Sequence, residues 1–431
     1  MILKKNLPNI ILIVCDTLGA KHMSLYGYER ETTPHLEQLV DKEGFTVYTN
    51  CYSTSCWTSP SHASLFTGLY PHEHGVNESN LLLPSKLATL PELLNSMGYK
   101  TIGISCNGLI GKFSGFNRGF EFFREMDRWH LFNQSAENLI KFQNFVSDAK
   151  NHQIFRIIRW IKEKKDIAIP VKYVLNKLFL KWKLPLDSKF FWKINRGVIN
   201  NATPYTNKAL KNALRILKDA ERPVFIFINL MQTHIKYNPP KGFRNKWSDY
   251  NSPYKRCSQN PINHYAHTPF TQDVLDYFCA LYDEEILYLD YKLCDFLKKL
   301  KEIHLDRMMV IITSDHGEHF GEDGHFSHML SLHDAVTKIP LLIKFPGSTK
   351  AEHISSLVQI NDLYATVLDL VNAPFPIPRS SISLTRLGRK QALMEITRPE
   401  VWLDRIKDHR LKDKFAQTGF RREIRSEANL R

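Results

Sequence analysis

The sequence lacks paired cysteines, long hydrophobic runs and any recognisable nucleic-acid-binding module. Its seven cysteines are scattered and include no CxxC pair, so we expect free thiols in a reducing compartment and no disulfide framework. The apolar run from Ile10 to Val14 spans only five residues. Because this is too short for a signal-peptide core or a membrane span, we expect a cytoplasmic chain.

The sequence also has fewer acidic than basic residues. The chain has 58 Lys and Arg against 44 Asp and Glu, a formal net charge of +14. This excess favours anionic partners, either an esterified substrate or a membrane surface. Without a nucleic-acid-binding module, no nucleic-acid partner is expected. At 431 residues, with 43% hydrophobic and 24% charged residues, the chain can bury a sizeable core.

Three continuous apolar runs predict strands buried on both faces of a parallel sheet, at residues 10–14, 224–230 and 308–313. Each run is followed by polar residues, among them Asp16, His234 and Asp315. Open α/β sheets bind their ligands beyond the carboxyl ends of the strands. We therefore expect these three side chains to lie near one ligand site.

Apolar residues at spacings of three and four predict helices near residues 34–40, 61–67, 90–94 and 274–302. Alternating strands and helices indicate an α/β fold with a doubly wound, mostly parallel sheet flanked by helices. We assign residues 1–375 to this α/β domain and residues 376–431 to a small C-terminal subdomain with a basic tail.

A basic, aromatic insertion is predicted at residues 124–200. Between Lys150 and Arg196 there are 13 Lys or Arg and only three acids, interleaved with Phe and Trp. Pro170 and Pro185 interrupt an otherwise helical pattern. The segment is either a helical cap with solvated lysines or a docking surface for anionic lipid or substrate.

The densest chemical signal begins at Thr58, whose hydroxyl precedes Pro60 and a helix-favouring run. This order places Thr58 at or just before a helix N-terminus, where unpaired N–H groups and the helix dipole favour an anion such as phosphate or sulfate. Taken alone, the residue would be an N-cap threonine, which is the commoner use of threonine at such a position.

This stretch resembles the signature C/S-x-P-S-R-x-x-L-x-T-G of the sulfatases, which belong to the alkaline phosphatase superfamily. The matching residues are Thr58-Ser-Pro60-Ser61-His62-Ala-Ser-Leu65-Phe-Thr67-Gly68. The resemblance continues, in the family's order, through DTLGAKHMSLYGY near the start, GFNRGFEFF at 115–123, MQTHIKYNPP, YDEEILYLD at 282–290, SDHGEHFGEDGHFSH at 314–328 and KIPLLIKFPG at 338–347. It therefore covers most of the chain.

Two positions depart from the family pattern. Sulfatases carry Cys or Ser at the first signature position and oxidise it to formylglycine, but this chain has Thr58, which is not a substrate for that modification, and no formylglycine is expected. Threonine here resembles the phosphoethanolamine and phosphoglycerol transferases of the superfamily, which attack through the alkoxide. The usual Arg is replaced by His62, a weaker and titratable cationic partner.

The resemblance also implies a metal site. Asp16 stands at the family's first acidic ligand, and Asp315 with His316 stands at the second-half ligand pair. With the Thr58 hydroxyl they would hold one divalent cation, which lowers the pKa of that hydroxyl. Thr17 replaces a further family Asp, so Mn²⁺ or Zn²⁺ is favoured, with Ca²⁺ as the alternative.

By the same resemblance, His234 and His328 hold the ester's charge or act as general acid. Asn107 lies where arylsulfatases have a Lys-x-His pair, and we expect it to hydrogen-bond the ester.

The resemblance leaves three functions open: a hydrolase of sulfate or phosphate esters, a transferase that moves a phosphoryl-alcohol group on lipid or polysaccharide, and a catalytically silent binding protein. The substrate would be an anionic ester of a carbohydrate or a lipid. Its identity is not fixed by the fold.

Overall fold

The structure is a computed structural model that describes residues 7–126, 202–257, 270–386, 388–403, 412 and 421–425. All described residues belong to one compact unit formed by Met1–Met126 and Asn201–Arg431. The predicted basic insertion at 124–200 lies outside the described residues, apart from its first three. Among the described residues, no helix is both long and apolar enough to cross a bilayer.

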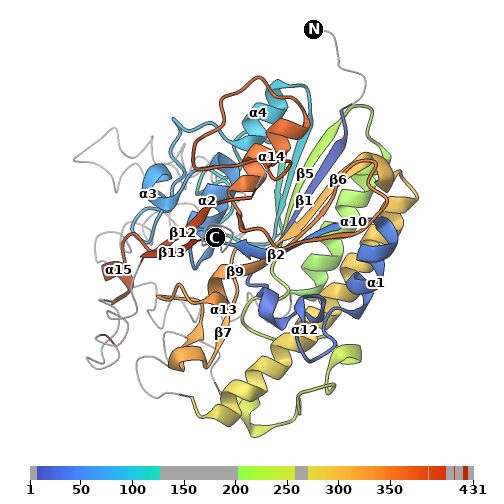
Figure 1. Cartoon of the computed structure of the whole chain (residues 1–431). Helices are drawn as coiled ribbons and strands as arrows, with labels where there is room; N and C mark the ends of the chain where they lie inside the picture. Colours follow the sequence, from blue (N-terminus) through green and yellow to red (C-terminus); the bar gives the residue numbers. More distant parts are fainter. Residues whose placement is uncertain are drawn as a thin grey trace, which may run out of the picture. The chain divides into compact units, whose positions relative to one another are not determined.

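A mostly parallel nine-stranded sheet forms the centre of this unit (Figure 1). The strand order is β10-β2-β9-β6-β1-β5-β3-β4, and β11 also pairs with β2. Only β9 runs antiparallel to its neighbours, β2 and β6. The strands are β1 (Asn9–Cys15), β2 (Thr46–Tyr52), β3 (Lys100–Ser105), β4 (Phe122–Glu125), β5 (Val224–Leu230), β6 (Met308–Thr313), β9 (Lys338–Lys344), β10 (Glu352–Ile354) and β11 (Val358–Gln359).

Helices cover both faces of the sheet, which confirms the predicted doubly wound α/β fold (Figure 1). Successive side chains of β1 alternate between the two core clusters, with Ile11 and Ile13 in one and Ile10 and Leu12 in the other. One face packs against α1 (Pro34–Glu43), α10 (Thr203–Lys218) and α12 (Gln272–Lys301). The other packs against α2 (Thr58–Thr67), α4 (Leu90–Ser96) and α14 (Asp362–Leu370).

The helix ends follow local sequence signals. Proline occupies the first turn of α1, α4 and α10, where its missing N–H costs no hydrogen bond. Helix α2 ends at Gly68, which has a φ of +74° and donates its N–H to the carbonyl of Ser64. A Cβ at Gly68 would lie 2.8 Å from the Tyr364 ring, so both the conformation and the packing require glycine.

Helix α12 ties several loops to the core through buried carboxyl groups. Glu284 accepts hydrogen bonds from the backbone N–H groups of residues 246, 247 and 248. Glu285 accepts from the N–H of Asn238. Asp290 accepts from the N–H groups of His35 and Leu36, at the start of α1, which has no side-chain cap of its own.

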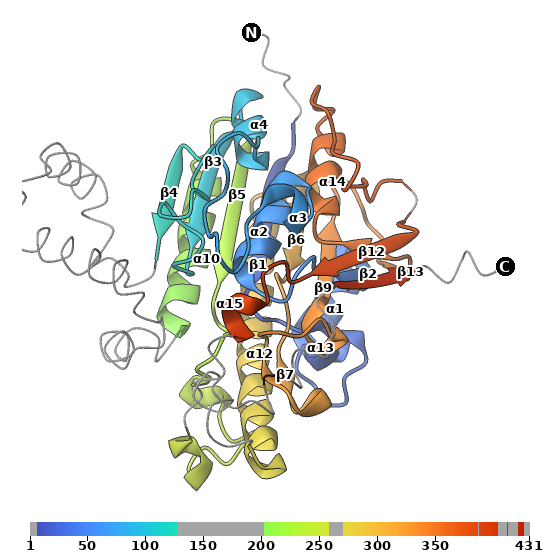
Figure 2. The same cartoon turned by 90° about the vertical axis from the view of Figure 1, so that its left-hand side faces the viewer.

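The C-terminal region packs against the residues that precede α2. Strands β12 (Gln391–Glu395) and β13 (Arg421–Arg425) pair as an antiparallel ribbon, which Figure 2 shows in red, and α15 (Glu400–Leu403) comes between them in the sequence. Ala392 and Met394 join Cys56 and Trp57 in a third buried cluster. Other short elements are α3 (Pro71–His74), β7 (His319–Phe320), β8 (Phe326–Ser327), α13 (Asp334–Thr337) and several 3-10 turns.

Candidate active site

The candidate site lies at the carboxyl ends of β1 and β6. These strands are neighbours in parallel register, with Val14 beside Thr313. Asp16 directly follows β1, and Asp315 is the second residue after β6. The pairing therefore brings together two acids that are about 300 residues apart in the chain, as the strand pattern predicted.

Asp16, Asp315 and His316 form a tight, fully buried group. Nε2 of His316 lies 3.5 Å from Oδ2 of Asp315 and 4.0 Å from Oδ1 of Asp16. Nδ1 of His316 lies 3.0 Å from the carbonyl oxygen of Gly317, which can only accept. Nδ1 must therefore carry the proton, and Nε2 presents a lone pair to the two carboxylates.

Each carboxylate in this group has one bonded oxygen and one unpaired oxygen. Oδ2 of Asp16 accepts from the Asn107 amide at 2.7 Å, and Oδ1 of Asp315 accepts from the N–H of Thr17. The other two oxygens, Oδ1 of Asp16 and Oδ2 of Asp315, are buried without a hydrogen-bond partner. These are the two oxygens that face Nε2 of His316.

This donor set fits a divalent cation. Burial, and secondly the charge of Asp315, raises the pKa of Asp16, and burial raises the pKa of Asp315 to about 7. Burial lowers the pKa of His316 to about 3, so its ring is neutral and able to ligate. A cation would compensate two buried charges that otherwise cost several kcal/mol each, and Asp and His donors suit Zn²⁺ or Mn²⁺.

Thr58 is the first residue of α2 and points toward the same group. Its Oγ1 lies 3.5 Å from Nε2 of His316, and the residue is only 3% exposed. All ten residues of α2 are buried, so the N-terminus of this helix opens into the protein interior. The unpaired N–H groups of a helix's first turn favour an anion at that position.

The backbone is strained at Thr17, the residue that follows Asp16. Thr17 has a φ of +62°, a region that β-branched residues rarely adopt. Its N–H donates to Asp315, its carbonyl accepts from the Tyr282 hydroxyl at 2.6 Å, and its Oγ1 lies 2.7 Å from the carbonyl oxygen of Thr233. These contacts hold the turn that directs Asp16 toward Asp315.

His62 is a buried, hydrogen-bonded residue, whereas the signature predicted a positively charged partner of the nucleophile at this position. Its Nδ1 lies 3.0 Å from the carbonyl oxygen of Thr58, and its Nε2 lies 3.4 Å from the Asn229 amide nitrogen. Nδ1 is also 3.5 Å from Oδ2 of Asp315. Burial lowers the pKa of His62 to about 4, so the ring is neutral near pH 7.

Asn107 supports the site from the end of β3. Its amide nitrogen donates to Asp16, and its Oδ1 accepts from the N–H of Leu109. Both amide atoms therefore have protein partners. The geometry gives Asn107 the role of orienting the Asp16 carboxylate, which differs from the expected contact with an ester.

His234 and His328 lie beside the buried group. The ring of His328 is 4.3 Å from the ring of His316 and 5.6 Å from that of His234, centroid to centroid. Nδ1 of His328 contacts Oε1 of Glu318 at 2.9 Å, and Nδ1 of His234 lies 2.7 Å from the carbonyl oxygen of Ile235. Both histidines are half-buried, so they line the accessible side of the site.

Two residues of this site were missed by the sequence analysis. Glu318 is fully buried and bonds to His328, and Asn229, the penultimate residue of β5, contacts His62. The adjacency of Glu318 to Asp315 and His316 was a signal that could have indicated the first. Asn229 had a comparable signal, because it is a polar residue within an apolar strand.

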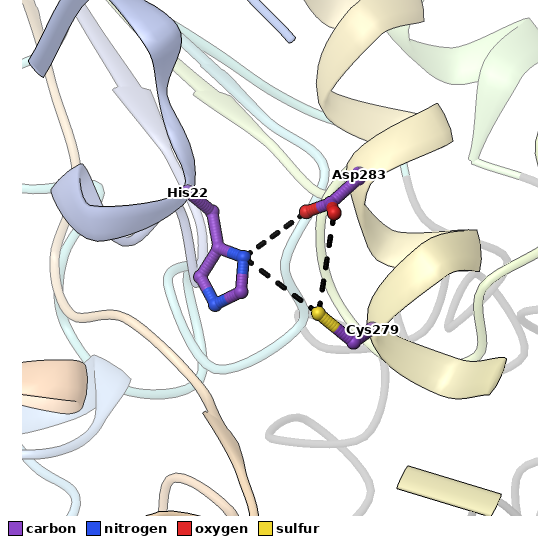
Figure 3. Close-up of side chains that lie close together, drawn as sticks. All are labelled: His22, Cys279 and Asp283. Atoms are coloured by element: carbon purple, nitrogen blue, oxygen red, sulfur yellow. Dashed lines mark hydrogen bonds and ion pairs between the residues drawn. The ribbon is translucent and has the colours of Figure 1, made fainter. Parts of the chain in front are cut away.

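A second group with metal-ligand chemistry lies elsewhere in the described part of the chain (Figure 3). Nδ1 of His22 is 3.0 Å from Oδ1 of Asp283 and 3.9 Å from Sγ of Cys279. Oδ2 of Asp283 accepts from Tyr28 and, at 2.7 Å, from Arg30. Because the guanidinium already compensates this carboxylate, and burial raises the pKa of the Cys279 thiol to about 12, the group acts as an anchor for residues 20–30 on α12.

Comparison with known proteins identifies the family of this chain. A family profile described as "Sulfatase" matches residues 8–373. N-acetylglucosamine-6-O-sulfatase of Bacteroides thetaiotaomicron is 23% identical over 403 residues, covering 88% of this chain and 70% of that protein. Arylsulfatase K of Canis lupus familiaris is 24% identical over 396 residues, covering 88% of this chain and 66% of that protein. The chain thus spans about two thirds of the length of these relatives.

Solved structures agree on the fold. The phosphonate monoester hydrolase of Agrobacterium radiobacter superposes with a TM-score of 0.63 at 17% identity, covering 90% of this chain and 80% of that one.

Proposed function

The chain belongs to the sulfatase family, and from this premise we propose that it is a metal-dependent hydrolase that cleaves a sulfate or phosphate ester with unmodified Thr58 as its nucleophile. One observation carries the proposal: Oγ1 of Thr58 lies 3.5 Å from Nε2 of His316, beside the two unpaired carboxylate oxygens of Asp16 and Asp315. A hydroxyl next to a cation-binding group at a helix N-terminus has the means to attack an anionic ester.

Asp16, Asp315, His316 and the Thr58 hydroxyl would hold the cation, Zn²⁺ or Mn²⁺ by preference. When bound, the ion lowers the pKa of the hydroxyl and offsets the charge of the ester oxygens. Asn107 and Thr17 fix the two carboxylates in place. They act on the ester only through the groups they orient.

The Thr58 hydroxyl loses its proton to water as Oγ1 bonds to the sulfur or phosphorus atom. The bond from that atom to the bridging oxygen breaks, and the bridging oxygen takes a proton from His234 or His328. The resulting sulfo- or phospho-threonine is then cleaved by water. Residues at the start of α2 stabilise the anion throughout, because their N–H groups face it.

The substrate we propose is an anionic ester carried on a carbohydrate or a lipid. A carbohydrate is supported by the Bacteroides relative, whose name gives a 6-O-sulfated aminosugar as its substrate. The net charge of +14 supports either source, and a peripheral contact with anionic membranes as well. All seven cysteines are free thiols, which supports a reducing, cytoplasmic location.

Threonine at position 58 favours a second candidate function, transfer of the phosphoryl-alcohol group to an acceptor hydroxyl. The first half of the reaction is the same, and an acceptor alcohol replaces water in the second half. The third alternative, a silent binding protein, is opposed by the retention of Asp16, Asp315 and His316 together beside the Thr58 hydroxyl.

The test is a screen of purified protein with nitrophenyl sulfate, phosphate and phosphodiester across Mn²⁺, Zn²⁺ and Ca²⁺. Thr58→Ala provides the blank. We expect metal-dependent release of nitrophenol from at least one ester, and acceleration by an added alcohol would identify the transferase. Activity that survives both chelation and Thr58→Ala would rule the proposal out.

A further inference from the structure

Glu318 makes two hydrogen bonds inside the candidate site, although it neither holds the cation nor contacts the ester in the proposed reaction. Its Oε1 lies 2.9 Å from Nδ1 of His328, and its Oε2 accepts from the Tyr237 hydroxyl at 2.9 Å. Glu318 is fully buried, and the side chain of His328 is 13% exposed. The carboxyl group is thus hidden behind the histidine, which alone can reach a substrate.

The contact with Glu318 selects the outward-facing nitrogen of His328. Nδ1 is occupied by the carboxyl group, which leaves Nε2 as the nitrogen available to a ligand. A carboxylate at Glu318 and a neutral His328 ring can together bind one further proton. When they do, the proton that lies between Oε1 and Nδ1 can be bonded to either atom. In both arrangements Nε2 carries a hydrogen that it can donate.

His234 lacks this support. Its Nδ1 lies against the carbonyl oxygen of the next residue, Ile235, at 2.7 Å. A backbone carbonyl orients the ring but takes up no proton. His328, by contrast, has a carboxyl partner, and its ring lies 4.3 Å from the ring of His316, next to the position of Thr58. Of the two histidines, His328 is therefore the one whose ring is held by a carboxyl group that can share a proton with it.

We propose that Glu318 is the positioning residue that holds His328 as the general acid for the leaving group, an inference that rests on the proposed ester cleavage. As the bond from sulfur or phosphorus to the bridging oxygen breaks, that oxygen takes the electron pair, and Nε2 of His328 passes its proton to it. Nδ1 keeps or receives the shared proton from Glu318. The products are a neutral alcohol, the covalent threonine adduct and a neutral imidazole.

General-acid catalysis matters only when the leaving group needs a proton. Nitrophenolate leaves as a stable anion, whereas an alkoxide does not. The experiment therefore compares kcat/KM for a nitrophenyl ester and for an alkyl ester of the same acid. The enzymes are the wild type, Glu318→Leu and Glu318→Gln. Leucine removes the acceptor of the Nδ1 proton, and glutamine retains an oxygen at that position.

We expect Glu318→Leu to lower kcat/KM for the alkyl ester by about 10²- to 10⁴-fold. The fold-loss in kcat/KM for the nitrophenyl ester should be at least about ten times smaller. Glu318→Gln should recover part of the alkyl-ester activity, because its amide oxygen still holds the ring. Tyr237→Phe, which removes the second bond to Glu318, should show the same selective loss at smaller size.

Glu322→Gln is the matched control. Glu322 lies four residues further along, where it bonds to Lys21 and His319, so its loss should leave the ratio between the two substrates unchanged. Metal content and the unfolding midpoint are measured for every variant, because Glu318 is close to His316 in the chain. Equal losses of Glu318→Leu on both esters, or no loss, overturn the role of Glu318. Absence of wild-type turnover on either ester overturns the proposed function and the positioning role together.

Discussion

Oγ1 of Thr58 and Nε2 of His316 lie 3.5 Å apart although 258 residues separate them in the chain. Thr58 comes from the N-terminus of α2, and His316 follows β6. The pair joins the two halves of the site, one that supplies a hydroxyl and helix N–H groups and one that supplies metal-ligand chemistry.

Thr58→Ser should keep most of the activity, and Thr58→Ala should lose about a thousandfold or more in kcat, since only alanine removes the attacking oxygen. Mass spectrometry of the substrate-quenched enzyme should find the adduct on Thr58. Thr67→Ala, which removes a buried hydroxyl at the other end of α2, is the control and should leave kcat intact. An adduct elsewhere, or formylglycine at Cys56, would refute the assignment.

Asp315→Asn should weaken metal binding at least about tenfold, because it removes a charged ligand and leaves the shape of the side chain. The check is the rise in unfolding temperature on titration with Zn²⁺ or Mn²⁺; a ligand at 100 times its Kd stabilises by about 2.7 kcal/mol. Asp290→Asn, another buried carboxyl substitution, should lower stability but keep the metal-induced rise. An unchanged rise in Asp315→Asn would mean that the site is misplaced.

Gly317→Ala should lower both stability and metal affinity. A Cβ at Gly317 would lie 2.3 Å from the carbonyl oxygen of Ala335, so the segment that carries Asp315 and His316 must move. Gly242→Ala is the matched control, because nothing lies within 4 Å of its Cβ position. Equal behaviour of the two variants in thermal unfolding and metal titration would contradict the close packing described for Gly317.

Glu285 should make the protein less stable as the pH rises. Burial raises the pKa of Glu285 from 4.5 to about 8, so the folded state holds a proton that the unfolded state has lost. Stability is therefore lost between pH 4.5 and about 8, at no more than about 1.4 kcal/mol per pH unit from this group. In chemical unfolding, Glu285→Gln should gain stability relative to the wild type across that window. A constant difference would show that Glu285 ionises normally.

Anionic liposomes should retain the protein at low salt and release it at high salt. Each Lys or Arg near such a surface contributes about 1 kcal/mol, screened within a Debye length. The sequence between Lys150 and Arg196, outside the described residues, carries most of this expectation. Co-sedimentation that is the same with neutral and anionic lipids would exclude the membrane contact.

Much of the scaffold follows from short-range patterns in the sequence. The apolar runs at 224–230 and 308–313 coincide with β5 and β6, and the predicted helix at 274–302 matches α12 within two residues. Asp16 and Asp315 could be expected to meet because each follows such a run, and parallel strands end at one edge.

The contacts of the site depend on long-range packing, which no local pattern encodes. Asn107 donates to Asp16 across 91 residues, and Asn229 contacts His62 across 167. The signature suggested a cationic His62, but its protonation depends on burial, which is known only once α2 is seen to lie inside the core. For the same reason, Glu318 could be noticed in the sequence without its partner His328 being identified.

The carboxyl groups of α12 also determine how the loops can detach from the core. The N–H groups of residues 35, 36, 238, 246, 247 and 248 all donate to side chains of this one helix. None of these amides can exchange its hydrogen with solvent until the bond to α12 breaks. Amide exchange at positions far apart in sequence should therefore occur in one cooperative opening whose free energy is that of detaching the loops from α12.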